Sequence, residues 1–362
     1  MIKVQIVADS VNSFGDRLTS LVLTYPRIIH SEMMTHRMFS RNASSSRAVP
    51  VDKMIKAVRE NTFCPFEFQK AHKGMQGFEY FTGKDKQECI DLWLESAELA
   101  LQQAEKMKAK GISKQIINRI LEPYQYYTVL ITSSKEGWDN FFNLRCPQYE
   151  YIVNGEKNYS KSWKDYIEVG KKILDKKDFE IAKCWEADTL DRLKLNKGQA
   201  EIHMMALAEC IYDAMDESKP KQLFKGEWHI PYYDKIVPLK ANIKDIGIVE
   251  YYPNPGFPGE IMDCVKISTA MAARTSYTIV GEEKEIDYQK MIDLHDKLIN
   301  QNPPHSSPME HCARAMNEDE YSSYTKTKPV DLETNDIRDV SLGWCRNFKG
   351  FIQYRHIIET KK

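Results

Sequence analysis

Residues 87–110 constrain the fold more than any other stretch of the sequence. Apolar side chains recur there at helical spacing, and Gly111 follows as the expected stop. The members of this stripe are Ile90, Leu94, Ala97, Leu101, Ala104 and Met107. Because the stripe covers one face only, we predict a long helix that packs on that side and meets solvent on the other.

Shorter segments with strand and helix patterns surround this helix. Alternating or β-branched runs predict strands over 2–8, 20–25, 124–133, 247–252 and 349–358. Helical spacing predicts helices over 199–215, 259–275 and 286–301. Polar or proline-containing stretches predict an ordered loop over 40–46, a connector over 216–247 and a polar loop over 317–338. Residues 146–197 are rich in Lys, Asp, Tyr and Trp, and we interpret them as an insertion that is helical around 161–192.

The composition excludes several classes of protein. The chain has 362 residues, of which 42% are apolar and 28% charged, so it can bury a sizeable core. Its 51 Lys and Arg balance 52 Asp and Glu, which argues against a nucleic-acid partner and requires any anion site to be local. The N-terminus is too short and polar for a signal peptide, and no run of about 18 apolar residues predicts a membrane span. The eight cysteines form no CxxC pair and no disulfide framework, so we expect no metal and a reducing, cytoplasmic setting.

The segment 36–47 carries the densest group of anion-binding residue types. It holds one histidine, four serines and three arginines (Arg37, Arg41 and Arg47) within twelve residues. The planar guanidinium of arginine matches phosphate oxygens, and serine hydroxyls and loop amides add further donors. A solvated basic loop is the alternative interpretation, although Phe39 and Val49 would anchor the segment in the core.

Two further segments bear groups that could carry chemistry. Arg145 ends the short helical turn 140–145, where its charge requires either a carboxylate of the protein or a ligand oxygen that gains charge during reaction. In 304–311 the prolines restrict the backbone and hold His305 and His311 in place, although a buried core histidine is the alternative. No GxGxxG, GxxxxGK[ST] or GxSxG motif is present, so a dinucleotide or flavin site here would not be of the Rossmann type.

These segments resemble the flavin-dependent thymidylate synthases. The family signature RHRxxSxNExSxR is similar in register to Thr35–Arg37, Ser40, Asn42, Ser45 and Arg47. The family segments AR-x-VLP, YT, NFLNLR and AQxEI are similar to Asn118–Leu121 with Pro123, Tyr127-Thr128, Asn140–Arg145 and Gln199–Ile202. The family segments AARxSY and HxSPFEH are similar to Ala272–Tyr277 and His305–His311.

The order of these segments is permuted relative to the family. The family's opening block lies at 247–315, after its closing block, and Phe351–His356 resembles the segment that normally leads into the signature. This layout resembles a long form found among bacteriophage relatives, which implies a phage-infected bacterial host. The resemblance divides the chain into a part with the nucleotide signature (1–222, including the insertion), a connector (223–246) and a part with the flavin-contacting segment (247–362).

The resemblance also implies a fold, a reaction and an assembly. The fold would be α+β, with a mainly antiparallel sheet and flanking helices. The reaction would be the reductive methylation of dUMP to dTMP, with bound FAD and with methylenetetrahydrofolate and NADPH as co-substrates. The family builds its active sites from several subunits of a homotetramer, so we expect a homo-oligomer.

Individual roles follow from the matched positions. Arg145 would stabilise negative charge on the uracil ring. The nucleotide would be bound by Ser44, Ser45, Ser46, Arg47 and Arg119, with Glu32 at the position of a glutamine that touches it. FAD would be contacted by His36, Arg37, Asn140, His311 and Ser276.

The chain departs from the family pattern at several positions. Thr35, Ala43 and Ala48 replace the first Arg, the Glu and the Tyr of the signature, and Lys197 replaces a His. These changes leave two alternatives open: a flavin- and folate-dependent hydroxymethylase of a pyrimidine nucleotide such as dUMP or dCMP, or a nucleotide-binding homologue without activity.

Overall fold

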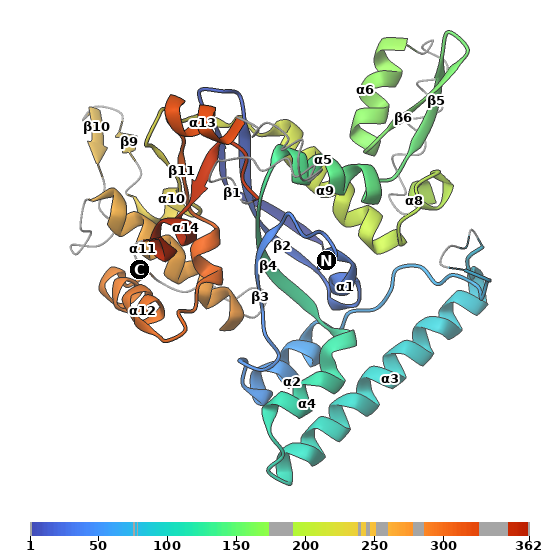
Figure 1. Ribbon diagram of the computed structural model, residues 1–362. Helices are drawn as coiled ribbons and strands as arrows, with labels where there is room; N and C mark the ends of the chain where they lie inside the picture. Colours follow the sequence, from blue (N-terminus) through green and yellow to red (C-terminus); the bar gives the residue numbers. More distant parts are fainter. Residues whose placement is uncertain are drawn as a thin grey trace, which may run out of the picture.

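A mainly antiparallel sheet forms the centre of the molecule (Figure 1). The computed structural model describes residues 2–74, 77, 79–173, 191–237, 240–243, 247–250, 260–277, 286–325 and 347–360. The sheet consists of β1 (Lys3–Val11), β2 (Arg17–Pro26), β3 (Ser40–Ala43), β4 (Tyr126–Ser134) and β7 (Lys221–Gln222) in the order β3-β4-β2-β1-β7. Only the β1–β7 pair is parallel. With its flanking helices, the described part of the chain confirms the predicted α+β class.

Strands β2 and β4 form the middle of this sheet because most of their side chains are apolar or small on both faces. Helix α5 (Lys135–Arg145) and helix α9 (Ile202–Glu217) cover one face, where Trp138 and Phe141 pack against Leu21 and Ile131. Glu201 caps α9 by accepting hydrogen bonds from the backbone of His203 and Met204. This packing fixes the end of α5, where Arg145 lies.

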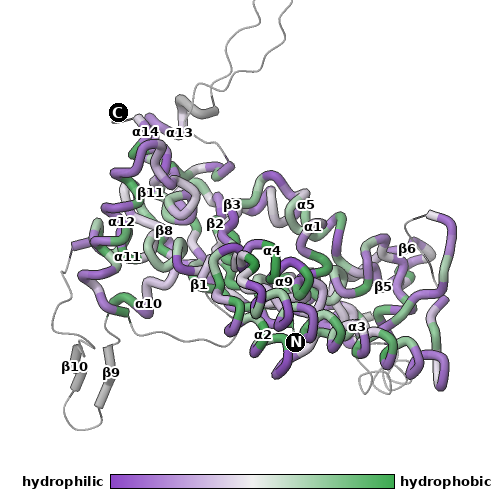
Figure 2. The backbone as a smooth tube through the Cα atoms, turned by 90° about the horizontal axis from the view of Figure 1, so that it is seen from below, coloured by the Kyte–Doolittle hydropathy of each residue, from purple (hydrophilic) through white to green (hydrophobic). Residues whose placement is uncertain are grey.

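The predicted long helix is α3 (Gly83–Ala109), which runs beside α2 (Val51–Glu60) and α4 (Lys114–Leu121) (Figure 1). The stripe packs only over part of its length: Ala97, Leu101 and Ala104 are buried, whereas Leu94 is 41% exposed. The three helices share a small apolar cluster, separate from the core beneath the sheet. Figure 2 shows polar residues along much of the remaining length of α3.

The insertion 146–197 contains a hairpin that the sequence analysis did not predict. β5 (Tyr149–Val153) and β6 (Glu156–Ser160) pair through a turn at Asn154-Gly155, where both residues have positive φ. Asn-Gly is the residue pair that such a turn favours, so this signal was present in the sequence. The helical prediction for 161–192 holds for α6 (Trp163–Ile173), while 174–190 lie outside the described residues.

The remaining described elements include a second unit that packs beside β1–β4 (Figure 1). Its helices are α10 (Tyr233–Ile236), α11 (Ile261–Arg274), α12 (Tyr288–Asn300), α13 (Glu318–Thr325) and α14 (Tyr354–Glu359). Its strands are β8 (Trp228–His229), β11 (Ala313–Ala315) and β12 (Phe351–Gln353), with the separate pair β9 (Lys240–Ile243) and β10 (Gly247–Glu250). Short helices elsewhere are η1 (Arg27–Ile29), α1 (His30–Met33), η2 (Glu122–Tyr124), α8 (Asp191–Leu195), η3 (Thr275–Tyr277) and η4 (Ser307–Glu310).

Several predicted elements differ in the structure. Part of the expected loop 40–46 is strand β3, because Ser40–Ala43 pair with Thr132–Val129 of β4. Strand β12 ends at Gln353 and continues as helix α14, so the strand predicted to residue 358 was wrong in its second half. The polar loop from 317 begins as helix α13, and 326–338 lie outside the described residues.

The expected connector 216–247 is more than a linker. It carries β7, β8 and α10, and β8 pairs with β11 of the second unit. Ile230 and Ile236 are buried in the apolar cluster formed by α11 and α12. No helix among the described residues is long and apolar enough to cross a membrane.

Candidate functional site

The loop after β3 is held in place by backbone contacts from three segments. Ser44 donates its amide proton to the carbonyl of Thr128 over 2.9 Å, and its hydroxyl donates to the same oxygen over 3.2 Å. The Ser45 amide donates to the carbonyl of Ser276 over 3.0 Å. Residue 276 belongs to the late block, so the structure brings two predicted site residues together from opposite ends of the chain.

Asn118 is the residue that fixes this loop most directly. Its side chain is fully buried, and its amide nitrogen donates to the carbonyls of Ser46 (2.7 Å) and Val49 (2.9 Å). Its amide oxygen is buried without a hydrogen-bond partner among the described residues. The sequence analysis assigned Asn118 no role, although an amide at the alanine position of the family segment was a signal.

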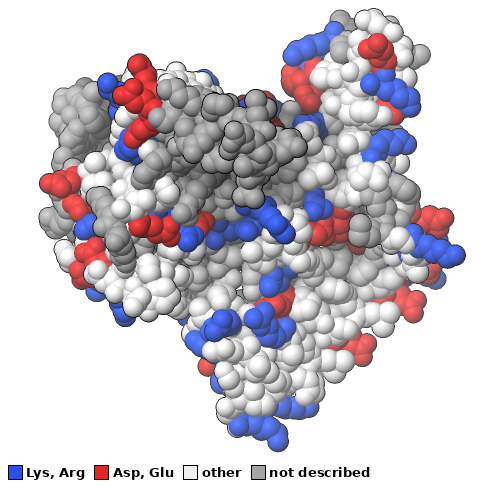
Figure 3. All heavy atoms as spheres, viewed as in Figure 1, with Lys and Arg blue, Asp and Glu red and all other residues white. Residues whose placement is uncertain are grey.

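The predicted nucleotide-binding side chains differ in their availability. Arg47 is exposed and makes no ion pair with any residue that the structure describes, so its guanidinium can receive an anion. Arg119 is also exposed but pairs with Glu122 at 3.1 Å. Ser46 is only 4% exposed and its side chain bonds to Tyr127, so its hydroxyl serves the fold. Figure 3 shows Lys and Arg side chains gathered on the face that carries β3.

Arg145 lies in a second polar cluster, formed by the end of α5, by α1 and by the segment that follows α1. Its Nη1 donates to Glu32 over 3.0 Å, its Nη2 donates to Thr35 Oγ1 over 3.3 Å, and its Nε donates to His36 Nε2 over 3.1 Å. The guanidinium therefore has a carboxylate partner within the chain, which was one of the two alternatives for its charge. Three acceptors at one guanidinium fix its orientation.

The electrostatics of this cluster set the protonation of its members. Burial, with the nearby Arg145 and Arg41 guanidinium groups, lowers the pKa of His36 to about 4. His36 is therefore neutral near pH 7, consistent with Nε2 accepting from Arg145. Burial raises the pKa of Glu32 above its ordinary value, although the Arg145 charge acts in the opposite direction.

Arg37 and Asn140 lie beside this cluster with exposed side chains. Arg37 follows His36 directly, and Asn140 is on α5 with Arg145. Within the described ranges neither side chain has a hydrogen-bond partner or an ion pair, so both can bind a ligand. A guanidinium and an amide are donors suited to diphosphate oxygens.

His311 is in a different environment from these exposed donors. It is 1% exposed, and its ring nitrogens contact Thr132 Oγ1 (2.8 Å) and the Asn42 amide (3.1 Å). Burial lowers the pKa of His311 to about 3, so the ring is neutral. His311 is therefore a buried core histidine, which was one of the two alternatives. The contact of His311 with FAD remains a prediction.

The two clusters lie at opposite ends of β3. Glu32, His36 and Arg145 are near its start, and the loop with Arg47 follows its end. A strand of four residues spans about 13 Å at the usual rise per residue. Arg47 and Arg145 therefore belong to two separate clusters within one copy of the chain.

The cysteines next to the motifs do not provide a nucleophile. Cys146 and Cys312 are buried, and burial raises the pKa of both thiols, that of Cys312 to about 12. No group of His, Cys, Asp and Glu among the described residues could hold a metal ion.

No protein-family model and no curated protein matches this chain. Among solved structures it is similar to a UMP/dUMP methylase, PolB, from Streptomyces cacaoi. The complex of PolB with 5-Br UMP is 17% identical with a TM-score of 0.34, covering 43% of this chain and 83% of that one. The complex with 5-Br dUMP is 14% identical with a TM-score of 0.33, covering 48% and 88%. Likeness of this degree establishes neither fold nor function, so the proposal below depends on the geometry of this chain.

Proposed function

We propose that this chain is a flavin-dependent thymidylate synthase of permuted order, which methylates dUMP reductively to dTMP with FAD, methylenetetrahydrofolate and NADPH. The observation that carries the proposal is the contact between segments that the family keeps in a different order. The late block and the closing segment both lie against the signature segment in space. If the short motifs resembled the family by chance, these segments would have no reason to lie in contact in the folded protein.

Three hydrogen bonds make these contacts. The Ser45 amide donates to Ser276, the ring of His311 bonds to Asn42, and the Gln353 side chain donates to Ser40 Oγ over 3.1 Å. Each bond joins residues more than 200 positions apart. In the family order the same segments would be neighbours in sequence, so the fold compensates for the permutation.

Each cluster has a separate task in the proposed reaction. Arg47, with the Ser45 hydroxyl, would hold the nucleotide phosphate because its charge is uncompensated by any described residue. Arg145 would stabilise the charge that develops on the pyrimidine when its C5 becomes nucleophilic. Glu32 must then yield its contact with Arg145 or take up a proton, and burial, which raises the pKa of Glu32, makes that protonation easier than for an exposed carboxyl group.

The donors around Arg145 fit the flavin nucleotide. Arg37 and Asn140 offer exposed groups for its diphosphate. The neutral His36 ring, which stacks on Phe39 and meets Phe141 edge to face, is buried and adds no charge to this cluster. When bound, FAD would supply the hydride that reduces the transferred carbon. The protein would contribute orientation and exclusion of water.

The separation of the two clusters leads us to propose a homo-oligomer, with a homotetramer as in the family. A second copy could place its own Arg47 loop opposite the Arg145 cluster of the first. Light scattering on the protein as it elutes from a gel-filtration column measures the number of subunits directly. A monomer that nevertheless turns over dUMP would contradict this part of the proposal.

The test of function uses the purified full-length protein with added FAD. We expect flavin absorbance that persists after gel filtration, and reoxidation of the NADPH-reduced flavin that requires both dUMP and methylenetetrahydrofolate. Mass spectrometry of the nucleotide product should show dTMP. The same assay with UMP or dCMP added as a competing substrate identifies the nucleotide that the protein prefers. A protein that fails to bind FAD would overturn the proposal.

The Glu32–Arg145 ion pair favours two alternatives. If Glu32 directs the pyrimidine differently from the family glutamine, the product would be a hydroxymethylated nucleotide, which is heavier than dTMP by one oxygen. If the pair stays closed, the chain would bind nucleotide and flavin without turnover. The same mass spectra separate all three cases.

A further inference from the structure

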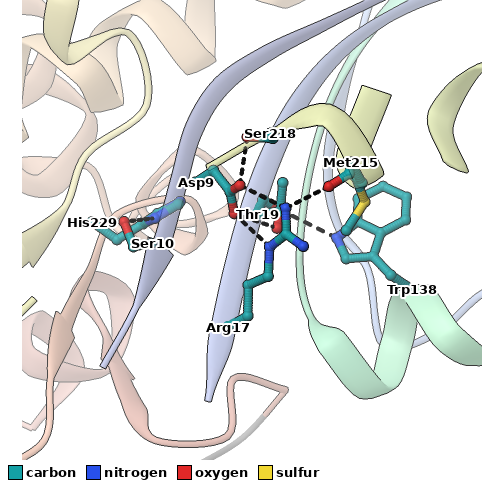
Figure 4. A network of polar contacts seen from close by, with 8 residues as sticks. All are labelled: Asp9, Ser10, Arg17, Thr19, Trp138, Met215, Ser218 and His229. Atoms are coloured by element: carbon teal, nitrogen blue, oxygen red, sulfur yellow. Dashed lines mark hydrogen bonds and ion pairs between the residues drawn. The ribbon is translucent and has the colours of Figure 1, made fainter. Parts of the chain in front are cut away.

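A chain of buried side chains crosses the central sheet away from the Arg145 cluster. It begins at Ser10 on β1, whose hydroxyl contacts His229 Nδ1 over 2.9 Å. His229 Nε2 contacts Ser20 Oγ on β2 over 2.8 Å, and Ser20 Oγ contacts Thr132 Oγ1 on β4 over 2.5 Å. All four residues are no more than 4% exposed. Figure 4 shows the first contact, between Ser10 and His229, next to the Asp9–Arg17 ion pair.

The chain continues from Thr132 to β3. Thr132 Oγ1 contacts His311 Nδ1 over 2.8 Å, and His311 Nε2 faces the side-chain amide of Asn42 at 3.1 Å. The nitrogen of this amide lies within 3.1 Å of the Arg41 carbonyl and 3.2 Å of the Ser307 carbonyl when it points to His311. In the opposite orientation the amide oxygen would face only acceptors. The neighbours therefore determine which way the amide points.

The amide orientation determines the direction of every later hydrogen bond. With the Asn42 nitrogen as donor, His311 Nε2 must accept, so the His311 proton is on Nδ1 and is donated to Thr132. A hydroxyl can accept twice but must place its own proton, and among the described residues Ser20 is the remaining hydrogen-bond partner of the Thr132 hydroxyl, so Thr132 donates to Ser20. By the same argument Ser20 donates to His229 Nε2. His229 consequently also carries its proton on Nδ1 and donates it to Ser10.

The His311 and His229 rings are both neutral and so carry one N–H proton each, as this arrangement requires. Burial lowers the pKa of His311 to about 3, and the nearby His229 ring acts in the same direction. Burial lowers the pKa of His229 to about 3 as well, with Asp9 acting weakly against it. Neutral imidazole is donor at one nitrogen and acceptor at the other, so each ring transmits the direction of the chain.

We infer that the Asn42 amide fixes the tautomers of both His311 and His229 through one directed series of hydrogen bonds. The two histidines are therefore positioning residues, which hold β3 and the segment before His311 in place. The inference does not depend on the proposed function. The hydrogen-bond series ends at Ser10, which lines a cavity of about 600 Å³ together with Trp228 and Tyr233. The hydrogen-bond series thus connects the wall of this cavity to β3, the strand that leads into the Ser44–Arg47 loop.

Nitrogen-15 NMR of the histidine rings in the full-length protein tests this inference, because the protonated and unprotonated ring nitrogens differ widely in chemical shift. In the wild type we expect both His311 and His229 to carry the proton on Nδ1. Asn42→Asp replaces the donor by an acceptor, so the proton of both rings should move to Nε2, including that of His229 four hydrogen bonds away. Asn158→Asp, the same change in the exposed hairpin, should alter neither ring.

Thr132→Val provides a second test if Asn42→Asp does not fold. It removes the hydroxyl in the middle of the chain, so His311 should keep its proton on Nδ1 while His229 becomes a mixture of tautomers. A wild-type ring with its proton on Nε2 would overturn the inference. An Asn42→Asp protein in which only His311 changes, or a Thr132→Val protein with an unchanged His229, would do the same.

Discussion

Replacing Asn118 by leucine should loosen the loop that carries Arg47. The substitution conserves size but removes the two hydrogen bonds to the carbonyls of Ser46 and Val49. A buried acceptor left without its donor costs about 1–3 kcal/mol. Part of this cost is offset, because the unpartnered amide oxygen of Asn118 is removed too. We therefore expect the loop to open more easily by about 2 kcal/mol.

Hydrogen exchange measures this opening at the backbone. The amides of Ala48 and Val49 donate to the Ser45 carbonyl and are protected only while the loop is closed. A change of about 2 kcal/mol corresponds to exchange that is about 30-fold faster. The exposed Gln115 on the same helix provides the matched control Gln115→Leu, which should leave exchange unchanged. Exchange in Asn118→Leu within a factor of three of wild type would refute the reasoning.

Three further predictions concern Arg145, Arg47 and His36. Arg145→Ala should lower turnover of dUMP by 100-fold or more, since a lost donor to a developing charge costs about 3 kcal/mol, whereas Arg145→Lys should retain part of it in the same assay. Arg47→Ala should weaken dUMP binding by calorimetry with flavin binding unchanged, and by more than Arg119→Ala, because Glu122 already compensates Arg119; equal losses would contradict the separate roles. The free energy of unfolding in urea should fall as pH drops from 6.5 to 4, because the unfolded chain takes up protons that the folded His36 excludes, as do other buried histidines such as His229 and His311. His36→Gln should reduce this slope by the contribution of one histidine, and an unchanged slope would exclude His36 as a contributor.

The sequence predicted the elements with strong periodicity. Helices α3, α9, α11 and α12 and strands β1, β2 and β4 lie close to their predicted ranges, because each has apolar residues at regular spacing that pack over at least part of its length. Strand β3 was missed because its four residues are mostly polar and become a strand only by pairing with β4. The β5–β6 hairpin was missed because β6 is polar and mostly exposed and so lacks a clear strand pattern, although the Asn-Gly turn pointed to the hairpin.

The candidate site was predicted in part, for a related reason. Motif positions identified Ser45, Arg47 and Arg145, but pairing depends on neighbours that are distant in sequence. A carboxylate partner for Arg145 was foreseen only as one of two alternatives, and Glu32 is that partner. The burial of His311 was likewise one of two interpretations of the histidine that follows Pro308. The amide of Asn118 could not be assigned before its distance to the loop was known.

The closing segment beside β3 has a consequence for how the chain can be divided. Because Gln353 reaches Ser40 and the His229 ring contacts both Ser10 and Ser20, the second unit is held by non-covalent contacts as well as by the peptide link. That link mainly keeps the two parts at a high local concentration. A protease cut in the exposed turn after Phe224 should therefore yield two fragments that co-elute under native conditions and separate only in denaturant. Fragments that part without denaturant would show that tethering, rather than the interface, keeps this molecule whole.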